Sequence, residues 1–148
     1  MFKRILVTVD GSDISNQALQ EAIKLTKENE AQLRIVHVVD TVTFDLNLDF
    51  SNISEISTSM INSGRGILEK AVAVARAAGI TAETSLIERD TLDKRVPELI
   101  MADAETWPAD LIVICTHGRT GLSHLFLGSV AERLVRVATK PILLIRGK

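Results

Sequence analysis

The most diagnostic segment for the fold class is Leu111-Ile112-Val113-Ile114-Cys115, which leads into Thr116-His117-Gly118. Five consecutive apolar residues that end at a turn are typical of a strand buried on both faces. Strands of this kind occur in parallel sheets that are covered by helices. The segment therefore predicts a domain of the α/β class.

Strand-like and helix-like patterns alternate along the rest of the chain. Further strands are predicted at residues 5–9, 33–39, 80–87 and 142–145, and helices at 14–25, 67–78, 96–100 and 129–138. Gly79 is expected to end the second of these helices, and Pro97 fits only the first turn of the third. The alternation predicts an open doubly wound parallel sheet with helices on both faces, in one domain spanning residues 1–148.

One stretch departs from this alternation. Residues 41–59 are rich in Thr, Asn and Ser and show no sustained apolar period, so we expect a long loop. Gly64 and Gly66 would each cost about 1 kcal/mol relative to alanine inside a helix. Because of these two glycines, the sequence does not define the residue at which the following helix starts.

Composition excludes several classes of protein. The chain has 148 residues and a net charge of −2, which predicts no general attraction to nucleic acid or to acidic membranes. Cys115 is the single cysteine, so there is neither an internal disulfide nor a cysteine cluster for zinc. The apolar run at the N-terminus is too short for a signal peptide or a membrane span. We expect a cytoplasmic protein without a side-chain metal site.

The segment from Cys115 to Glu132 connects the buried strand to a helix. Ser129 and Glu132 have the spacing of a capping box, which predicts the helix start at Ser129. A helix N-terminus offers unpaired N–H groups and partial positive charge to phosphate oxygens, and Gly118 and Gly128 would let the backbone approach them. The alternative is that the glycines only close the connection and Ser129 only caps the helix.

Asp10 provides a second candidate site, at the end of the first strand. In open α/β sheets, ligands bind beyond the carboxyl ends of the strands, where the strand order reverses. If the first and fourth strands are neighbours, Asp10 and Gly118 face one crevice, where Asp10 could bind ribose hydroxyls or a phosphate-bound metal ion. A helix-capping aspartate is the alternative.

The chain resembles the universal stress protein family, specifically its ATP-binding subgroup, over essentially its whole length. The resemblance is carried by residues 7–12, 36–39, 109–119, 127–132 and 140–145. It implies a Rossmann-like sheet in the order 3-2-1-4-5. ATP-binding members carry a signature of Gly, two residues, Gly, nine residues, and Gly-Ser or Gly-Thr. Gly118 and Gly128-Ser129 match its later positions, and Cys115 replaces the first glycine.

The resemblance also implies the binding residues. Thr8, Val9 and Asp10 would line the nucleoside side of a pocket, and the backbone of Val38 or Val39 would contact adenine. Phosphates would be surrounded by Gly118, Arg119, Gly128, Ser129 and Val130. The implied ligand is ATP, or AMP or ADP, with Mg²⁺ bound through the phosphates.

The family further implies a homodimer through strand 142–145, whose apolar edge would pair with another chain. The leading functional hypothesis is a nucleotide-binding regulatory module of the stress response that signals to a protein partner through residues 41–59. A slow ATPase or phosphotransferase, with His117 or His124 as an acid–base group or Cys115 as a nucleophile, is one alternative. A dimeric adaptor that binds no nucleotide is the other. Neither a Walker phosphate loop nor a dinucleotide fingerprint occurs in the chain.

Overall fold

The computed structural model describes residues 1–42, 53–117 and 127–147 of the chain. Its elements are, in order, β1 (Arg4–Thr8), α1 (Asp13–Asn29), β2 (Gln32–Asp40), α3 (Ile53–Ala77), β3 (Glu83–Arg89), α4 (Val96–Thr106), β4 (Leu111–Cys115), α5 (Ser129–Val137) and β5 (Ile142–Ile145). The predicted alternation of strands and helices is thus confirmed.

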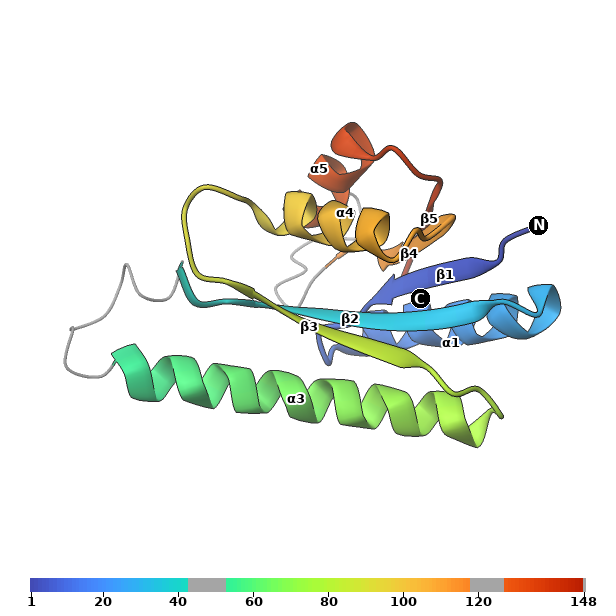
Figure 1. The fold of residues 1–148 in the computed structure, drawn as a ribbon, viewed down its shortest axis with the longest axis horizontal. Coiled ribbons are helices and arrows are strands. Elements are labelled where there is room, and N and C mark those ends of the chain that lie inside the picture. Colours follow the sequence, from blue (N-terminus) through green and yellow to red (C-terminus); the bar gives the residue numbers. More distant parts are fainter. Residues whose placement is uncertain (43–52, 118–126, 148) are drawn as a thin grey trace.

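The five strands form one parallel sheet in the order β3-β2-β1-β4-β5. β1 lies in the middle, where Ile5 is the register partner of Leu33 on one side and of Leu111 on the other. Helices α1 and α3 cover one face of the sheet and α4 and α5 cover the other (Figure 1). The predicted doubly wound topology is confirmed, and its strand order reverses between β1 and β4.

Two apolar cores lie on the two faces of the sheet. Along β1, Ile5 and Val7 belong to the core beneath α1 and α3, whereas Leu6 belongs to the core beneath α4 and α5. This division follows from the alternation of side chains along a strand. All five residues of β4 are buried, as the continuous apolar run predicted.

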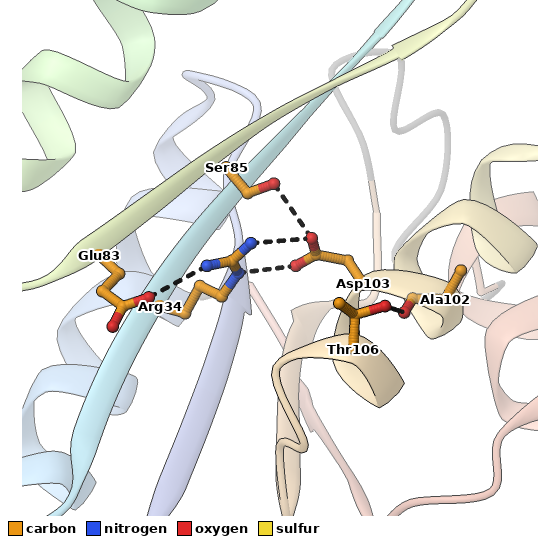
Figure 2. A network of polar contacts seen from close by, with 6 residues as sticks. All are labelled: Arg34, Glu83, Ser85, Ala102, Asp103 and Thr106. Atoms are coloured by element: carbon orange, nitrogen blue, oxygen red, sulfur yellow. Dashed lines mark hydrogen bonds and ion pairs between the residues drawn. The ribbon is translucent and has the colours of Figure 1, made fainter.

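A polar network fastens α4 to the amino-terminal half of the sheet. The guanidinium of Arg34 on β2 donates two hydrogen bonds, of 2.9 and 3.0 Å, to the carboxylate of Asp103 on α4 (Figure 2). Ser85 on β3 donates to the same carboxylate at 3.1 Å, and Arg34 also reaches Glu83 at 3.1 Å. The hydrogen bond to Asp103 is the main reason that the pKa of Arg34 is raised. Charge-assisted bonds of this kind fix the helix relative to the strands.

Helices α1 and α4 extend to Asn29 and Thr106, beyond their predicted ends, and the structure also corrects α3 and β3. Residues 53–59 belong to α3 rather than to a loop, and Gly64 and Gly66 lie inside that helix. The third strand begins at Glu83 rather than at residue 80, because Gly79 has φ +87° and Ile80 donates its N–H back to the carbonyl of Ala75. The residues after Ala77 therefore complete the helix end before the strand starts.

Within the part of the chain that the structure describes, none of the helices combines the length and the apolar character needed to cross a membrane.

Candidate functional site

The strand ends at which the crevice was predicted, those of β1 and β4, lie side by side. The two strands are paired up to Val7 and Val113, and their continuations carry Asp10 and Thr116 beyond the end of the sheet. The negative charge of Asp10 is one cause of the raised pKa of Cys115, as expected of neighbouring strand ends. The arrangement matches the position at which open α/β sheets bind their ligands.

Hydrogen bonds with Ser12 and Ser15 hold Asp10 in a turn before α1. Its Oδ1 accepts the N–H of Ser12 at 2.9 Å, and its own N–H donates to Oγ of Ser15 at 3.2 Å. Ser12 is the N-cap of α1, since its Oγ accepts the N–H of Ser15 at 3.2 Å. The alternative that Asp10 itself caps the helix is therefore wrong. Asp10 braces the turn, and Gly11 supplies the positive φ of 84° that the turn requires.

The end of β2 extends beyond the last residue with which β1 pairs. Pairing between β1 and β2 stops at Thr8 and Val36, followed by a bond of 2.8 Å from the N–H of Val9 to the carbonyl of Val36. Successive residues of a strand direct their N–H and C=O groups to opposite neighbours. Val38 therefore directs its N–H and C=O to the side on which β1 has ended. Val39 directs its own toward β3.

The start of α5 lies next to the end of β4. Gly128 is the N-cap in extended conformation, its N–H donates to the carbonyl of Thr116 at 2.6 Å, and its carbonyl accepts the N–H of Glu132. The predicted capping box is wrong, because Ser129 is the first helical residue and the carboxylate of Glu132 instead pairs with Arg136 at 2.9 Å. The helix start does not use the Ser129 hydroxyl as a cap. This hydroxyl and the backbone N–H groups of Ser129 and Val130 lie in the first turn, where an anion is stabilised.

Other predicted residues are only partly brought together. Gly118, Arg119 and His124 lie outside the described residues. His117 is buried, with Nδ1 2.8 Å from the hydroxyl of Thr116. The Cys115 thiol donates to the carbonyl of His117 at 2.9 Å. Burial, with a smaller contribution from Asp10, raises the pKa of this thiol to about 11, which disfavours a nucleophilic role.

The sequence analysis did not predict an ion pair that joins the ends of β2 and β3. Arg89, the last residue of β3, pairs with the carboxylate of Asp40, the last residue of β2, at 3.0 and 3.2 Å. The Nε of Arg89 donates to the carbonyl of Lys94 at 2.6 Å, and the buried hydroxyl of Thr41 donates to the carbonyl of Arg89. Only the strand register, which makes Asp40 and Arg89 partners, could have indicated this pair.

Comparisons with known proteins show which family of sequences the chain is similar to. The family model described as the universal stress protein family matches residues 1–146. A universal stress protein of Methanocaldococcus jannaschii is 33% identical, over 99% of this chain and 83% of that protein. One from Bacillus subtilis is also 33% identical, over 99% of this chain and 100% of that protein.

Solved structures resemble the chain as well. A protein of the universal stress protein family from Burkholderia pseudomallei superposes with a TM-score of 0.78 at 31% identity, covering 98% of this chain and 96% of that one. A universal stress protein from Archaeoglobus fulgidus, solved in complex with dAMP, has a TM-score of 0.67 at 25% identity, with 97% of each chain covered. The chain described here therefore belongs to the universal stress protein family.

Proposed function

We propose that this protein binds an adenine nucleotide (ATP, ADP or AMP) in the crevice beyond β1 and β4 and acts as a regulatory module in the stress response. The observation that carries the proposal is that the backbone of Val38, Asp10 and the first turn of α5 all stand next to the carboxyl ends of β1 and β4. Their chemistries correspond to the three parts of a nucleotide. The dAMP complex of the Archaeoglobus fulgidus relative supports the same ligand class.

Each part of the nucleotide has a complementary group. The N–H and C=O of Val38 suit the donor and acceptor edge of adenine, which offers the N6 amino group and N1. The carboxylate of Asp10 suits ribose hydroxyls, because it accepts strong charge-assisted hydrogen bonds. The amides of Ser129 and Val130 suit phosphate oxygens. Gly118 and Arg119 remain predicted phosphate contacts, and Mg²⁺, where present, would be held through the phosphates.

Asp10→Asn separates the ribose contact from the rest of the site. The amide oxygen of asparagine can still accept the N–H of Ser12, so the turn is expected to persist. We expect affinity for AMP to fall about tenfold or more, because a hydrogen bond to a charged group contributes about 1.5–3 kcal/mol. Isothermal titration calorimetry should show a much smaller loss for the 2′,3′-dideoxy analogue of AMP, which lacks the hydroxyls.

Absence of heat with AMP, ADP and ATP, with and without Mg²⁺, would remove the proposal. An equal loss for AMP and its dideoxy analogue would reject the ribose assignment and leave nucleotide binding intact.

The remaining expectations extend this proposal. The protein is expected to act in the cytoplasm as a homodimer joined through β5. Signalling to a protein partner through residues 41–59 is part of the same hypothesis. The hypothesis is supported by their position in the sequence, where they follow directly on β2, whose end carries the Val38 backbone.

A further inference from the structure

We propose that His37 is a positioning residue that keeps the backbone of Val38 open toward the crevice by binding the carbonyl of Val9. Nδ1 of His37 lies 2.7 Å from the carbonyl oxygen of Val9. Because a carbonyl can only accept, Nδ1 must carry the hydrogen in this contact. The identity of the ligand that binds to Val38 rests on the proposed function. The effect of His37 on the backbone does not depend on that function.

The strand ladder shows why this contact matters. In a regular parallel ladder, the bond from the N–H of Val9 to the carbonyl of Val36 is followed by one from the N–H of Val38 to the carbonyl of Val9. The first of these bonds is present at 2.8 Å. The second does not occur among the backbone hydrogen bonds of the described residues, and the Val9 carbonyl meets the imidazole instead. The side chain of His37 thus replaces the next step of the ladder.

The imidazole is held in place from the helix side by Gly64. A Cβ atom at position 64 would lie 2.9 Å from Cδ2 of His37 and 3.0 Å from both Cγ2 of Val39 and Cδ1 of Leu86. Only a residue without a side chain lets α3 approach the sheet this closely, although glycine costs about 1 kcal/mol relative to alanine inside a helix. Gly64 on one side and the Val9 carbonyl on the other therefore fix the position of the ring.

Two features together leave the N–H and C=O of Val38 available to a ligand. β2 continues for four residues beyond the last pair with β1, with its other edge paired to β3 throughout. Val38 lies in the middle of that extension, so its N–H and C=O are held rigidly while the neighbouring carbonyl of Val9 is occupied. A rigid adjacent donor and acceptor is the arrangement that recognises the edge of a planar heterocycle.

Amide hydrogen exchange measured by NMR without nucleotide tests this directly. His37→Phe keeps a ring of similar shape but removes the donor, so the Val9 carbonyl should recover the N–H of Val38. We expect exchange of the Val38 amide to slow at least tenfold, and affinity for AMP to fall at least tenfold. His37→Asn, which retains a side-chain N–H donor, should stay close to the wild type in both measurements.

Unchanged exchange at Val38 in a folded His37→Phe variant would overturn the inference. So would a wild-type protein whose His37 carries its hydrogen on Nε2, as read from the ¹⁵N shifts of the imidazole. If His37→Phe does not fold, the ¹⁵N shifts of the imidazole and the His37→Asn variant test the inference instead. If the wild type binds no nucleotide, the proposed function fails, while the exchange data still decide the role of His37.

Discussion

Cys115 belongs to the core and also ends the strand next to which the candidate site is predicted. It ends β4 and is 8% exposed, within the core that β4 shares with α1. Its thiol donates to the carbonyl of His117, which holds the chain as it leaves the strand. The sequence comparison with the family pointed to Cys115 because it replaces a glycine. That the side chain turns into the core could not be read from the sequence, since the residue lies at the junction of strand and turn.

The buried thiol predicts a specific alkaline weakening of the fold. Its pKa rises from an ordinary 9.0 to about 11 in the folded chain. Between these values the unfolded chain has lost a proton that the folded chain keeps, so stability is full below pH 9 and declines as the pH rises toward 11. The loss should approach about 3 kcal/mol, because one pKa unit corresponds to about 1.4 kcal/mol.

Urea unfolding at pH 8 and pH 11 checks this prediction. Cys115→Ala serves as the control, since it lacks the titrating group but shares every other ionisation. The free energy of unfolding of the wild type should fall more steeply with pH than that of the variant. Parallel pH profiles for the two proteins would contradict the prediction.

At the scale of elements, the sequence predicted the bounds of short, continuously apolar strands best. The bounds of β4 and β5 agree with the predicted ones, because both strands are short apolar runs between turn residues. The start of α3 was missed, since its first turns are rich in Ser and Thr and contain two glycines. A signal was nonetheless present: Ile56, Met60, Gly64 and Leu68 recur every four residues, and each is at least half-buried.

The candidate site was predictable in part for a related reason. Asp10 and Gly128 stand at the ends of recognisable elements, so their neighbourhood followed from the topology. The roles of His37 and Arg89 could not be predicted in this way, because both depend on contacts between residues far apart in the chain. The helix cap was misplaced by one residue, since Gly128 and Ser129 are both suitable N-cap types.

The two glycines of α3 predict opposite effects of the same substitution. Gly66 has open space around its missing Cβ, so Gly66→Ala should stabilise the protein by about 0.5–1 kcal/mol through helix propensity. Gly64→Ala gains the same propensity but forces a methyl group against His37 and Val39. Overpacking of a core costs about 1–3 kcal/mol, which leaves a net loss of about 1 kcal/mol.

Thermal and urea unfolding of the two variants measure these differences. Each variant is the matched control of the other, since both replace a glycine by alanine within one turn of the same helix. Stabilisation by Gly64→Ala would show that α3 can move away from the sheet, and it would weaken the argument that the imidazole of His37 is fixed.

For the molecule as a whole, the sheet order leaves β3 and β5 at its two edges. β5 consists of four apolar, half-buried residues, a composition that favours pairing with a second chain. Within β5, Ile145 directs its backbone toward β4, where its carbonyl accepts the N–H of Thr116 at 2.9 Å. By alternation, Leu144 directs its own N–H outward, away from the sheet.

This geometry gives a selective test of the proposed dimer. Leu144→Pro removes an outward N–H and spares the bonds to β4, so we expect a folded monomer, whereas the wild type and Leu144→Thr should be dimers. Light scattering over micromolar concentrations reports the mass, and circular dichroism reports the fold. A monomeric wild type, or a dimeric Leu144→Pro variant, would contradict assembly through this strand.

The bond of 2.6 Å between the N–H of Gly128 and the carbonyl of Thr116 has an evolutionary consequence. It joins the end of β4 to the start of α5 through main-chain atoms, so this link does not depend on the side chains at the two positions. Doubling the number of residues between two joined points costs only about 0.6 kcal/mol in closure entropy. Insertions and replacements between Thr116 and Gly128 are therefore expected to leave this main-chain bond in place.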